Sequence, residues 1–80
     1  MQPPADRTLA HALRQVRRDR GSTQEEVAHE ADITVAAFAR IERGEADPRW
    51  STVMRVVEAL KISLTELVAA IEDAPPLVSS

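Results

Sequence analysis

The sequence of 80 residues has no cysteine, no tyrosine, two glycines, one tryptophan and one phenylalanine. Without cysteine, the chain cannot form a disulfide, a thiolate zinc site or a thiol nucleophile. Two isolated glycines, Gly21 and Gly44, do not make a glycine-rich phosphate loop. No apolar run has the length of a membrane span, and the first residues are polar, without the apolar stretch of a secretory signal. We therefore expect a soluble, cytoplasmic protein with no membrane contact and no cofactor.

Strand signals are lacking as well, because aromatic residues make up 2% of the sequence and no segment alternates apolar and polar residues. Apolar residues instead recur at helical spacing in five segments, close to residues 8–19, 23–31, 35–43, 50–60 and 63–72. The pattern predicts an all-α protein with one compact five-helix domain over residues 8–72. Residues 1–7 are expected to be a flexible N-terminal arm and residues 73–80 a flexible C-terminal tail.

Capping residues mark the ends of these segments. Thr23–Glu26 and Ser63–Glu66 have the spacing of capping boxes, in which a hydroxyl and a glutamate satisfy backbone N–H groups reciprocally. Thr34 can cap the third helix in the same way. Gly21 and Gly44 are typical of the left-handed residue that follows a helix. The boundaries of the predicted helices therefore rest on local chemistry as well as on apolar spacing.

The apolar side chains of the five segments predict the core. The expected inward-facing residues are Leu9, Leu13, Val16, Val27, Ala28, Ala31, Phe38, Ile41, Trp50, Val53, Met54, Val57 and Leu60. Trp50 is expected to anchor the core at the start of the fourth helix rather than to stack on a nucleotide base. In the fifth helix, Leu64 and Leu67 are expected to close the core.

Residues 24–44 carry the pattern that indicates a function. Two short capped helices are joined by a tight turn, and the small Ala28 lets them approach closely at a steep angle. This is the geometry of a helix-turn-helix, whose second helix enters the major groove of DNA. The N-terminus of the first helix offers free N–H groups to a phosphate, and the second helix presents side chains to base edges.

Short motifs follow one another in order along residues 8–70. They are Arg17-x3-Gly21-x-Thr23-Gln24-Glu25-Glu26-Val27-Ala28, Ile33-Thr34, Ile41-Glu42-Arg43-Gly44, Asp47-Pro48 and Ala59-Leu60-x-Ile62-Ser63-Leu64-x-Glu66-Leu67. In this order and spacing they resemble the XRE family, the lambda-repressor/Cro-like helix-turn-helix domains. The resemblance implies a DNA-binding transcriptional regulator and not an enzyme.

The resemblance also implies roles for single residues. The positions that match the family's base-contacting residues are Val35, Ala36, Ala39 and Arg40. The positions that match phosphate-contacting residues are Thr23, Gln24, Thr34, Arg43 and Arg49. Arg17 and Glu42 match a partly buried ion pair that ties the first helix to the end of the third. Among the base-contacting positions only Arg40 can make a bidentate hydrogen bond to guanine, worth about 1–3 kcal/mol of discrimination.

The sequence departs from the family's pattern at five positions. Asp32 and Lys61 replace common cap glycines, and Ser22 stands where a buried leucine is usual. Glu45 and Asp47 lie in a loop where basic residues often approach DNA. The net charge of −3 is also unfavourable for DNA binding, because DNA affinity rests largely on lysines and arginines that neutralise phosphates. Basic residues are concentrated in residues 1–20 and 40–61.

Two functions remain open from the sequence. The first is a sequence-specific regulator that binds double-stranded DNA as a homodimer on a partly palindromic operator, with Leu64, Val68 and Ile71 as the candidate dimer surface. The second is a protein-interaction module, such as an antitoxin, that keeps the fold and has weak DNA affinity for want of polar residues on the recognition helix. Phage repressors, restriction–modification controllers and antitoxins all use this architecture.

Catalysis and metal binding find no support in the pattern. His11 and His29 fall on different predicted helices, without a further ligand set at metal spacing. Glu25 and Glu26 are adjacent on a helix and so do not face a common point. We expect no catalytic residues and no metal.

Overall fold

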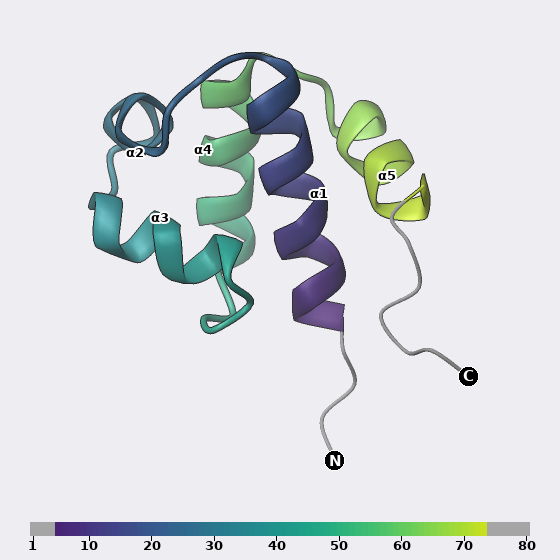
Figure 1. The fold of residues 1–80 in the computed structure, drawn as a ribbon, viewed down its shortest axis with the longest axis horizontal. Helices are drawn as coiled ribbons and strands as arrows, with labels where there is room; N and C mark the ends of the chain where they lie inside the picture. Colours follow the sequence, from purple (N-terminus) through teal and green to yellow (C-terminus); the bar gives the residue numbers. More distant parts are fainter. Residues whose placement is uncertain (1–4, 74–80) are drawn as a thin grey trace.

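The computed structural model describes residues 5–73, which form five helices (Figure 1): α1 (Ala5–Asp19), α2 (Gln24–Ala31), α3 (Val35–Glu42), α4 (Trp50–Leu60) and α5 (Leu64–Asp73). These residues contain no strand. α1 packs against α3 and α5, and α2 packs against α3 and α4. The all-α, five-helix prediction is confirmed. No helix in this part of the chain combines the length and the apolar character needed to cross a bilayer.

The first helix begins earlier than the sequence pattern indicates. α1 starts at Ala5 and not near Thr8, so residues 5–7 belong to the helix rather than to the predicted arm. Alanine is the strongest helix former, and no glycine or proline lies between Ala5 and Thr8 to oppose the helix. α5 ends at Asp73, one residue beyond the predicted domain boundary. The rest of the predicted arm and tail, residues 1–4 and 74–80, lies outside the described residues.

The helix starts follow the predicted capping chemistry. The Thr23 hydroxyl accepts the backbone N–H of Glu26 at 3.1 Å, and the Glu26 carboxylate accepts the N–H of Thr23 at 2.8 Å. Ser63 and Glu66 make the same reciprocal pair. The Thr34 hydroxyl accepts the N–H of Ala37. Both capping boxes and the Thr34 cap are therefore confirmed.

Each of the first four helices is followed by a residue in the left-handed region. These residues are Gly21, Asp32, Gly44 and Lys61, with φ between 59° and 72°. The backbone N–H of the residue that follows each of them donates to a carbonyl in the last turn of the helix, as from Ile33 to Ala28 and from Ile62 to Val57. Asp32 and Lys61 thus adopt a conformation that a glycine would adopt without strain.

The core lies between the helices and centres on Phe38 and Leu13, which are fully buried. The burial predicted for Val27, Ala28, Ala31, Ile41, Val53, Val57, Leu60 and Leu67 is confirmed. Val56 is also buried, although the sequence pattern did not assign it to the core. Leu9, Val16 and Met54 are half-buried.

Two core predictions are wrong. Trp50 is 63% exposed and Leu64 is 37% exposed. Each is the first residue of its helix, α4 and α5 respectively, where the helix emerges from a loop beyond the edge of the packed interior. Aliphatic side chains around Phe38 already fill that interior, so the indole ring of Trp50 stays outside it.

Candidate nucleic-acid interface

The α2–turn–α3 unit has the predicted helix-turn-helix form. α2 and α3 are each eight residues long, and they pack against one another. Ala28 is completely buried, as close approach of the two helices requires. The turn between them is set by the left-handed Asp32. In Figure 1, α3 lies on the opposite side of α1 from α5.

The outward side of α3 carries small side chains and one arginine. Val35 is 39% exposed, Ala36 and Arg40 are exposed, and Ala39 is half-buried. The other side of the helix is fixed in the core by Phe38 and Ile41. The structure therefore places the four predicted base-contacting residues on the outward side of one short helix, three of them exposed. Within residues 5–73 the guanidinium of Arg40 has no hydrogen bond or ion pair, so its donors remain available to a base.

Two helix starts lie beside this surface. The hydroxyls of Thr23 and Thr34 are exposed and use a lone pair for capping, which leaves each O–H proton available to a phosphate oxygen. The backbone N–H groups in the first turn of α2 add the positive end of a helix dipole. One amide N–H of Gln24 donates to Glu42 Oε1 at 2.8 Å in a partly buried hydrogen bond, so the predicted phosphate contact of Gln24 would rest on the second N–H of this amide.

Arg17 and Glu42 form a nearly enclosed ion pair. Arg17 donates from Nε to Oε2 at 2.7 Å and from Nη2 to Oε1 at 3.0 Å, and its Nη1 donates to the carbonyl of Ser22. The side chains of Arg17 and Glu42 are 13% and 2% exposed. With the amide of Gln24, this carboxylate joins α1, the start of α2 and the end of α3. The pair thus helps to fix the orientation of α3 relative to the start of α2.

A second Arg–Glu pair lies on the surface at the end of α3. Arg43 donates to both carboxylate oxygens of Glu45, at 3.0 and 3.1 Å, and both side chains are about half exposed. This hydrogen bonding, helped by the positive charges of Arg43 and Arg40, lowers the pKa of Glu45. The same hydrogen bonding, helped by the negative charge of Glu45, raises the pKa of Arg43. Arg43 is therefore exposed, as a phosphate contact requires, but it is paired with an acid. Arg49 is exposed at the start of α4 and caps nothing with its side chain.

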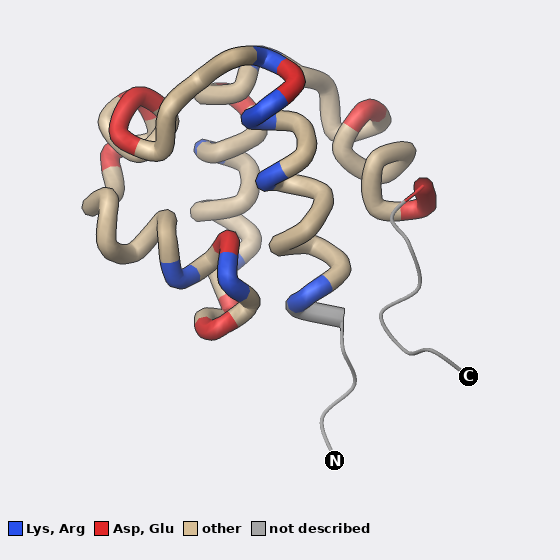
Figure 2. Tube along the Cα trace, viewed as in Figure 1, with Lys and Arg blue, Asp and Glu red and all other residues tan. Residues whose placement is uncertain are grey.

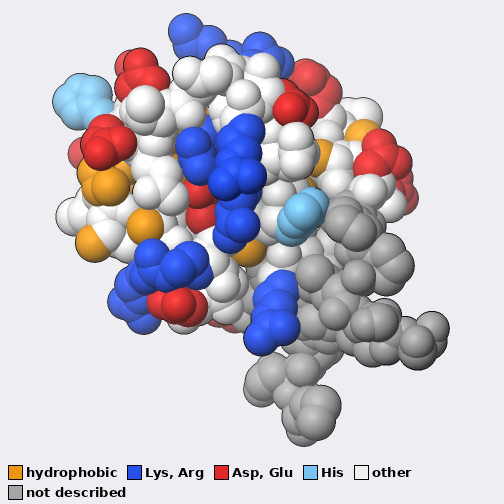
Figure 3. Space-filling model, in the orientation of Figure 1, with side chains coloured by type: hydrophobic (Ala, Val, Ile, Leu, Met, Phe, Trp, Pro, Cys, Tyr) orange, Lys and Arg blue, Asp and Glu red, His pale blue; other side chains and the backbone are white. Residues whose placement is uncertain are grey.

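Charge is distributed unevenly over the fold. Figure 2 shows acidic residues on α2 and α5 and basic residues along α1 and at the end of α3. Figure 3 shows lysine and arginine side chains gathered down the middle of the face on which α1 and α3 both lie. A net negative chain can in this way present a basic band to a polyanion. Arginines of α1 contribute to this band, and the sequence analysis assigned none of them to DNA.

An apolar groove lies on the α5 side of the molecule, away from α3. Its volume is about 440 Å³, and it is lined by Leu9, Pro48, Trp50, Val53, Leu64, Leu67, Val68 and Ile71. The three residues predicted as a dimer surface are thus brought together, with Val68 45% exposed and Ile71 half-buried. The sequence reasoning missed Trp50 as a wall of this groove. The signal available was its place at the first residue of a helix directly after Pro48-Arg49.

Comparison with known proteins agrees with this geometry. The helix-turn-helix domain family matches residues 8–70. The HTH-type transcriptional regulator y4dJ of Sinorhizobium fredii is 33% identical over 60 residues, covering 75% of this chain and 78% of its own length. The clp gene regulator ClgR of Corynebacterium glutamicum superposes with a TM-score of 0.82 at 25% identity, covering 90% of this chain and 92% of its own.

Restriction–modification controller proteins share the fold. The wild-type controller C.Esp1396I superposes with a TM-score of 0.84 at 15% identity, covering 89% of this chain and 95% of its own. The controller C.AhdI of Aeromonas hydrophila superposes with a TM-score of 0.74 at 24% identity, covering 78% of this chain and 94% of its own. With five helices, two capping boxes and the Arg17–Glu42 pair in place, the chain belongs to the helix-turn-helix domain family and has the lambda-repressor/Cro-like fold of XRE regulators.

Proposed function

We propose that this chain, a DNA-binding transcriptional regulator of the helix-turn-helix family, acts as a homodimer on a partly palindromic operator. The observation that carries the proposal is the outward side of α3, where the unpaired Arg40 stands among small exposed side chains beside two capped helix starts. The family and the fold are those of DNA-binding regulators rather than of enzymes. The operator, the residues that read it and the dimer are the parts that we infer.

Operator recognition would rest on one strong contact and several weak ones. Arg40 can donate two hydrogen bonds to O6 and N7 of a guanine, which is the commonest specific contact in the major groove. Val35 and Ala36 can make apolar contacts with thymine methyl groups. Thr23, Thr34, Arg43 and Arg49 would contact phosphates and so fix the register without reading sequence.

Arg40→Ala tests this reading. A site is first selected by the wild-type protein from a pool of random duplexes, and affinities are then measured by fluorescence anisotropy. We expect Arg40→Ala to lose about 1–3 kcal/mol per protomer on the selected site and little on random DNA. Arg55→Ala, which removes the same charge from an exposed position of α4, serves as the matched control. Equal losses on both DNAs would contradict the assignment of Arg40 as the base-reading residue.

The apolar groove supports the homodimer. Trp50, Leu64 and Val68 are large apolar side chains that solvent reaches in the single chain, and a two-fold contact would bury the same surface on both copies. A dimer would place two recognition helices on one face of DNA and would double the number of phosphate contacts of a chain with few basic residues. The domain is also small enough for association to add usefully to its stability.

The chain has a single tryptophan, so its fluorescence reports on the groove directly. We expect Trp50 emission to shift to shorter wavelength as the protein concentration rises, in parallel with dimer mass in sedimentation equilibrium. Val68→Glu should abolish both changes, because it places a charge in the contact. Val35→Glu, an equally exposed position on α3, should leave both intact. A mass that stays at the monomer value, with constant Trp50 emission, up to the highest protein concentration would refute the homodimer.

A second candidate is a protein-interaction module that binds a different protein through the same groove. The net charge of −3 and the Arg43–Glu45 pair favour it, because both weaken attraction to phosphate. Salt titration of DNA binding separates the two. Affinity that falls steeply with salt supports the regulator, and no binding above random DNA at low salt supports the module.

A further inference from the structure

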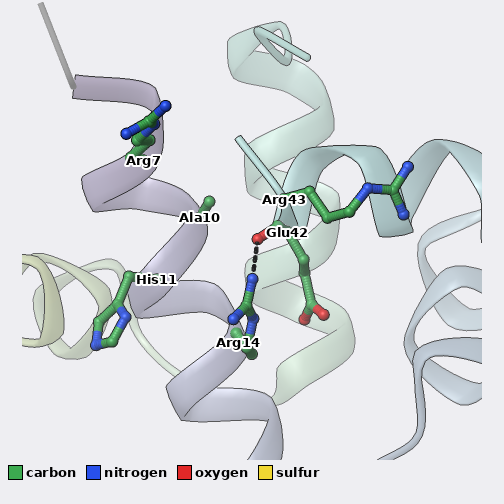
Figure 4. A pocket seen from close by; sticks show the side chains of 6 residues that line it. All are labelled: Arg7, Ala10, His11, Arg14, Glu42 and Arg43. Carbon is green, nitrogen blue, oxygen red and sulfur yellow. Dashed lines mark hydrogen bonds between the residues drawn. The ribbon is translucent and has the colours of Figure 1, made fainter. Parts of the chain in front are cut away.

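A shallow cleft separates the first half of α1 from the end of α3. Arg7, Ala10, His11, Arg14, Glu42 and Arg43 line it, and its volume is about 180 Å³ (Figure 4). This is smaller than the pockets of about 300–1,000 Å³ that hold drug-sized ligands. A single small polar group is therefore the occupant that its size permits.

Two arginines give the cleft its charge. Arg7 and Arg14 are seven residues apart, two turns along α1, and Ala10 lies between them with only a methyl group, so the space between the guanidinium groups is open. Within residues 5–73 the Arg7 guanidinium makes no hydrogen bond or ion pair. Arg14 donates one N–H, from Nη2 to the carbonyl of Glu42 at 2.7 Å, which leaves other donors of its guanidinium available.

The acids near the cleft do not neutralise these arginines. The Glu42 carboxylate faces away from the cleft and accepts three hydrogen bonds from Arg17 and Gln24. Glu45 is bound to Arg43, whose side chain points away from Arg7 and Arg14 in Figure 4. An anion that enters the cleft would therefore meet two arginines that are not already paired with a carboxylate.

The stem of Arg7 is held against the loop after α3. A Cβ atom built on Gly44 would lie 3.1 Å from Cγ of Arg7, so a glycine at this position permits the close packing of the stem on the loop. Contact with the loop restricts the stem, and an arginine that is restricted before binding loses less entropy when it binds. The cleft is thus a partly preorganised cation pair at the end of the recognition helix.

We infer that Arg7 and Arg14 bind a phosphate group, and that this phosphate belongs to the DNA backbone at the edge of the groove that α3 enters. The inference rests on the proposed function. Guanidinium groups match phosphate geometry and can bind it bidentately. The cleft borders the end of α3, and the basic band of Figure 3 runs along α1 on the same face as α3. The contact would add basic α1 residues to the phosphate contacts of α2 and α3.

The test is the salt dependence of operator binding by Arg7→Gln. Each phosphate contact contributes about 0.9 to the slope of log K against log salt. We expect Arg7→Gln to reduce the slope by about 1 per protomer and to weaken binding about tenfold at 0.1 M KCl on every duplex alike. Arg55→Gln is the control, because it removes the same charge outside the cleft and should leave the slope unchanged. Arg7 and Arg55 are both exposed, so the unfolding midpoints of the two variants should equal that of the wild type.

The outcomes separate the cleft from the proposed function. If the wild-type protein binds its selected site and Arg7→Gln has the same slope and affinity, the phosphate contact is refuted and the regulator stands. If the wild-type protein binds no DNA even at low salt, both fail. Titration with inorganic phosphate, followed through the NMR signals of the arginine Nε–H groups, distinguishes the source. Saturation of Arg7 by free phosphate, combined with an unchanged DNA slope, would assign the cleft to a soluble anion and overturn the DNA contact.

Discussion

Substitution of Glu42 by glutamine tests how much the enclosed ion pair stabilises the fold. The change keeps the shape of the side chain and removes its charge, so the loss reports electrostatics rather than a cavity. Arg17 would remain 13% exposed, with its Ser22 hydrogen bond intact, opposite a neutral amide. Removal of one partner from a fully buried pair costs about 3–5 kcal/mol, and the residual exposure of Arg17 argues for the lower end, about 3 kcal/mol.

A loss of this size is large for such a chain. Domains gain about 0.05–0.15 kcal/mol of stability per residue, which amounts to about 4–12 kcal/mol here. The same loss should lower the midpoint of thermal unfolding by roughly 12–24 °C for a domain of this length. Urea unfolding followed by circular dichroism at 222 nm measures the free energy, and an unchanged m-value would show that both states keep their compactness.

The chain provides its own control for this measurement. Glu45→Gln removes the same charge from an Arg–Glu pair of the same bidentate geometry, whose side chains are 52% and 55% exposed. Exposed pairs contribute about 0–1 kcal/mol, so we expect little change. If Glu42→Gln loses no more stability than Glu45→Gln, enclosure does not strengthen the Arg17–Glu42 pair and the reasoning is refuted. Arg17→Met combined with Glu42→Leu should recover most of the loss, because no charge then remains buried.

Three further predictions concern the surface and the helix ends. Glu45→Gln should strengthen DNA binding at neutral pH, because the lowered pKa of Glu45 keeps it charged and bound to Arg43 there. The Arg43–Glu45 ion pair is fully formed above the ordinary carboxyl pKa and is lost as pH falls through the lowered pKa of Glu45 in the folded protein. The gain in DNA affinity of Glu45→Gln over the wild type, measured by anisotropy titration, should therefore shrink on acidification. Ser22→Leu should fill the hollow of about 170 Å³ between α2 and α4 and raise stability by about 1 kcal/mol, whereas an unchanged melting temperature would show that the hollow cannot take the side chain. Lys61→Gly should raise the free energy of unfolding by about 0.5–1 kcal/mol, and Asp32→Gly should raise it by less. Both residues have a φ of 59°, but aspartate tolerates the left-handed region better than lysine does. Equal gains would contradict this ranking.

The helix boundaries were predictable because they depend on groups close together in the chain. Thr23, Thr34 and Ser63 cap backbone N–H groups within three residues, so their effect is visible in the sequence itself. The start of α1 was missed for the opposite reason. Ala5 has high helix propensity but carries no capping signal, and propensity alone marks no boundary.

Burial was less predictable than helix position. Helical spacing places Trp50 and Val53 on one face of α4, but it does not say where along that face the neighbouring helices stop. The interior covers Val53 and not the first turn, so Trp50 is exposed. Leu64 lies at the first turn of α5 and is exposed for the same reason.

Some features of the candidate site could be predicted from the sequence and others could not. The positions on α3 follow from the resemblance and from helix geometry, and the structure brings them together on one side. The contact of Arg17 with Glu42 joins residues 25 apart and came only from the resemblance. The hydrogen bond from Arg14 to the Glu42 carbonyl joins residues 28 apart and was not foreseen, because it depends on how α1 is set against the end of α3.

The small exposed side chains of α3 have a consequence for how such a protein diverges. Val35 and Ala36 face solvent, while Phe38 and Ile41 on the same helix belong to the core. The positions that we propose to contact DNA and the positions that hold the domain together are therefore different residues of a single eight-residue helix. A duplicated copy of the gene can replace Val35 or Ala36 with a polar residue, and so acquire a new operator, without passing through a destabilised intermediate. Substitutions that alter the DNA specificity of this chain would therefore change the free energy of unfolding only slightly.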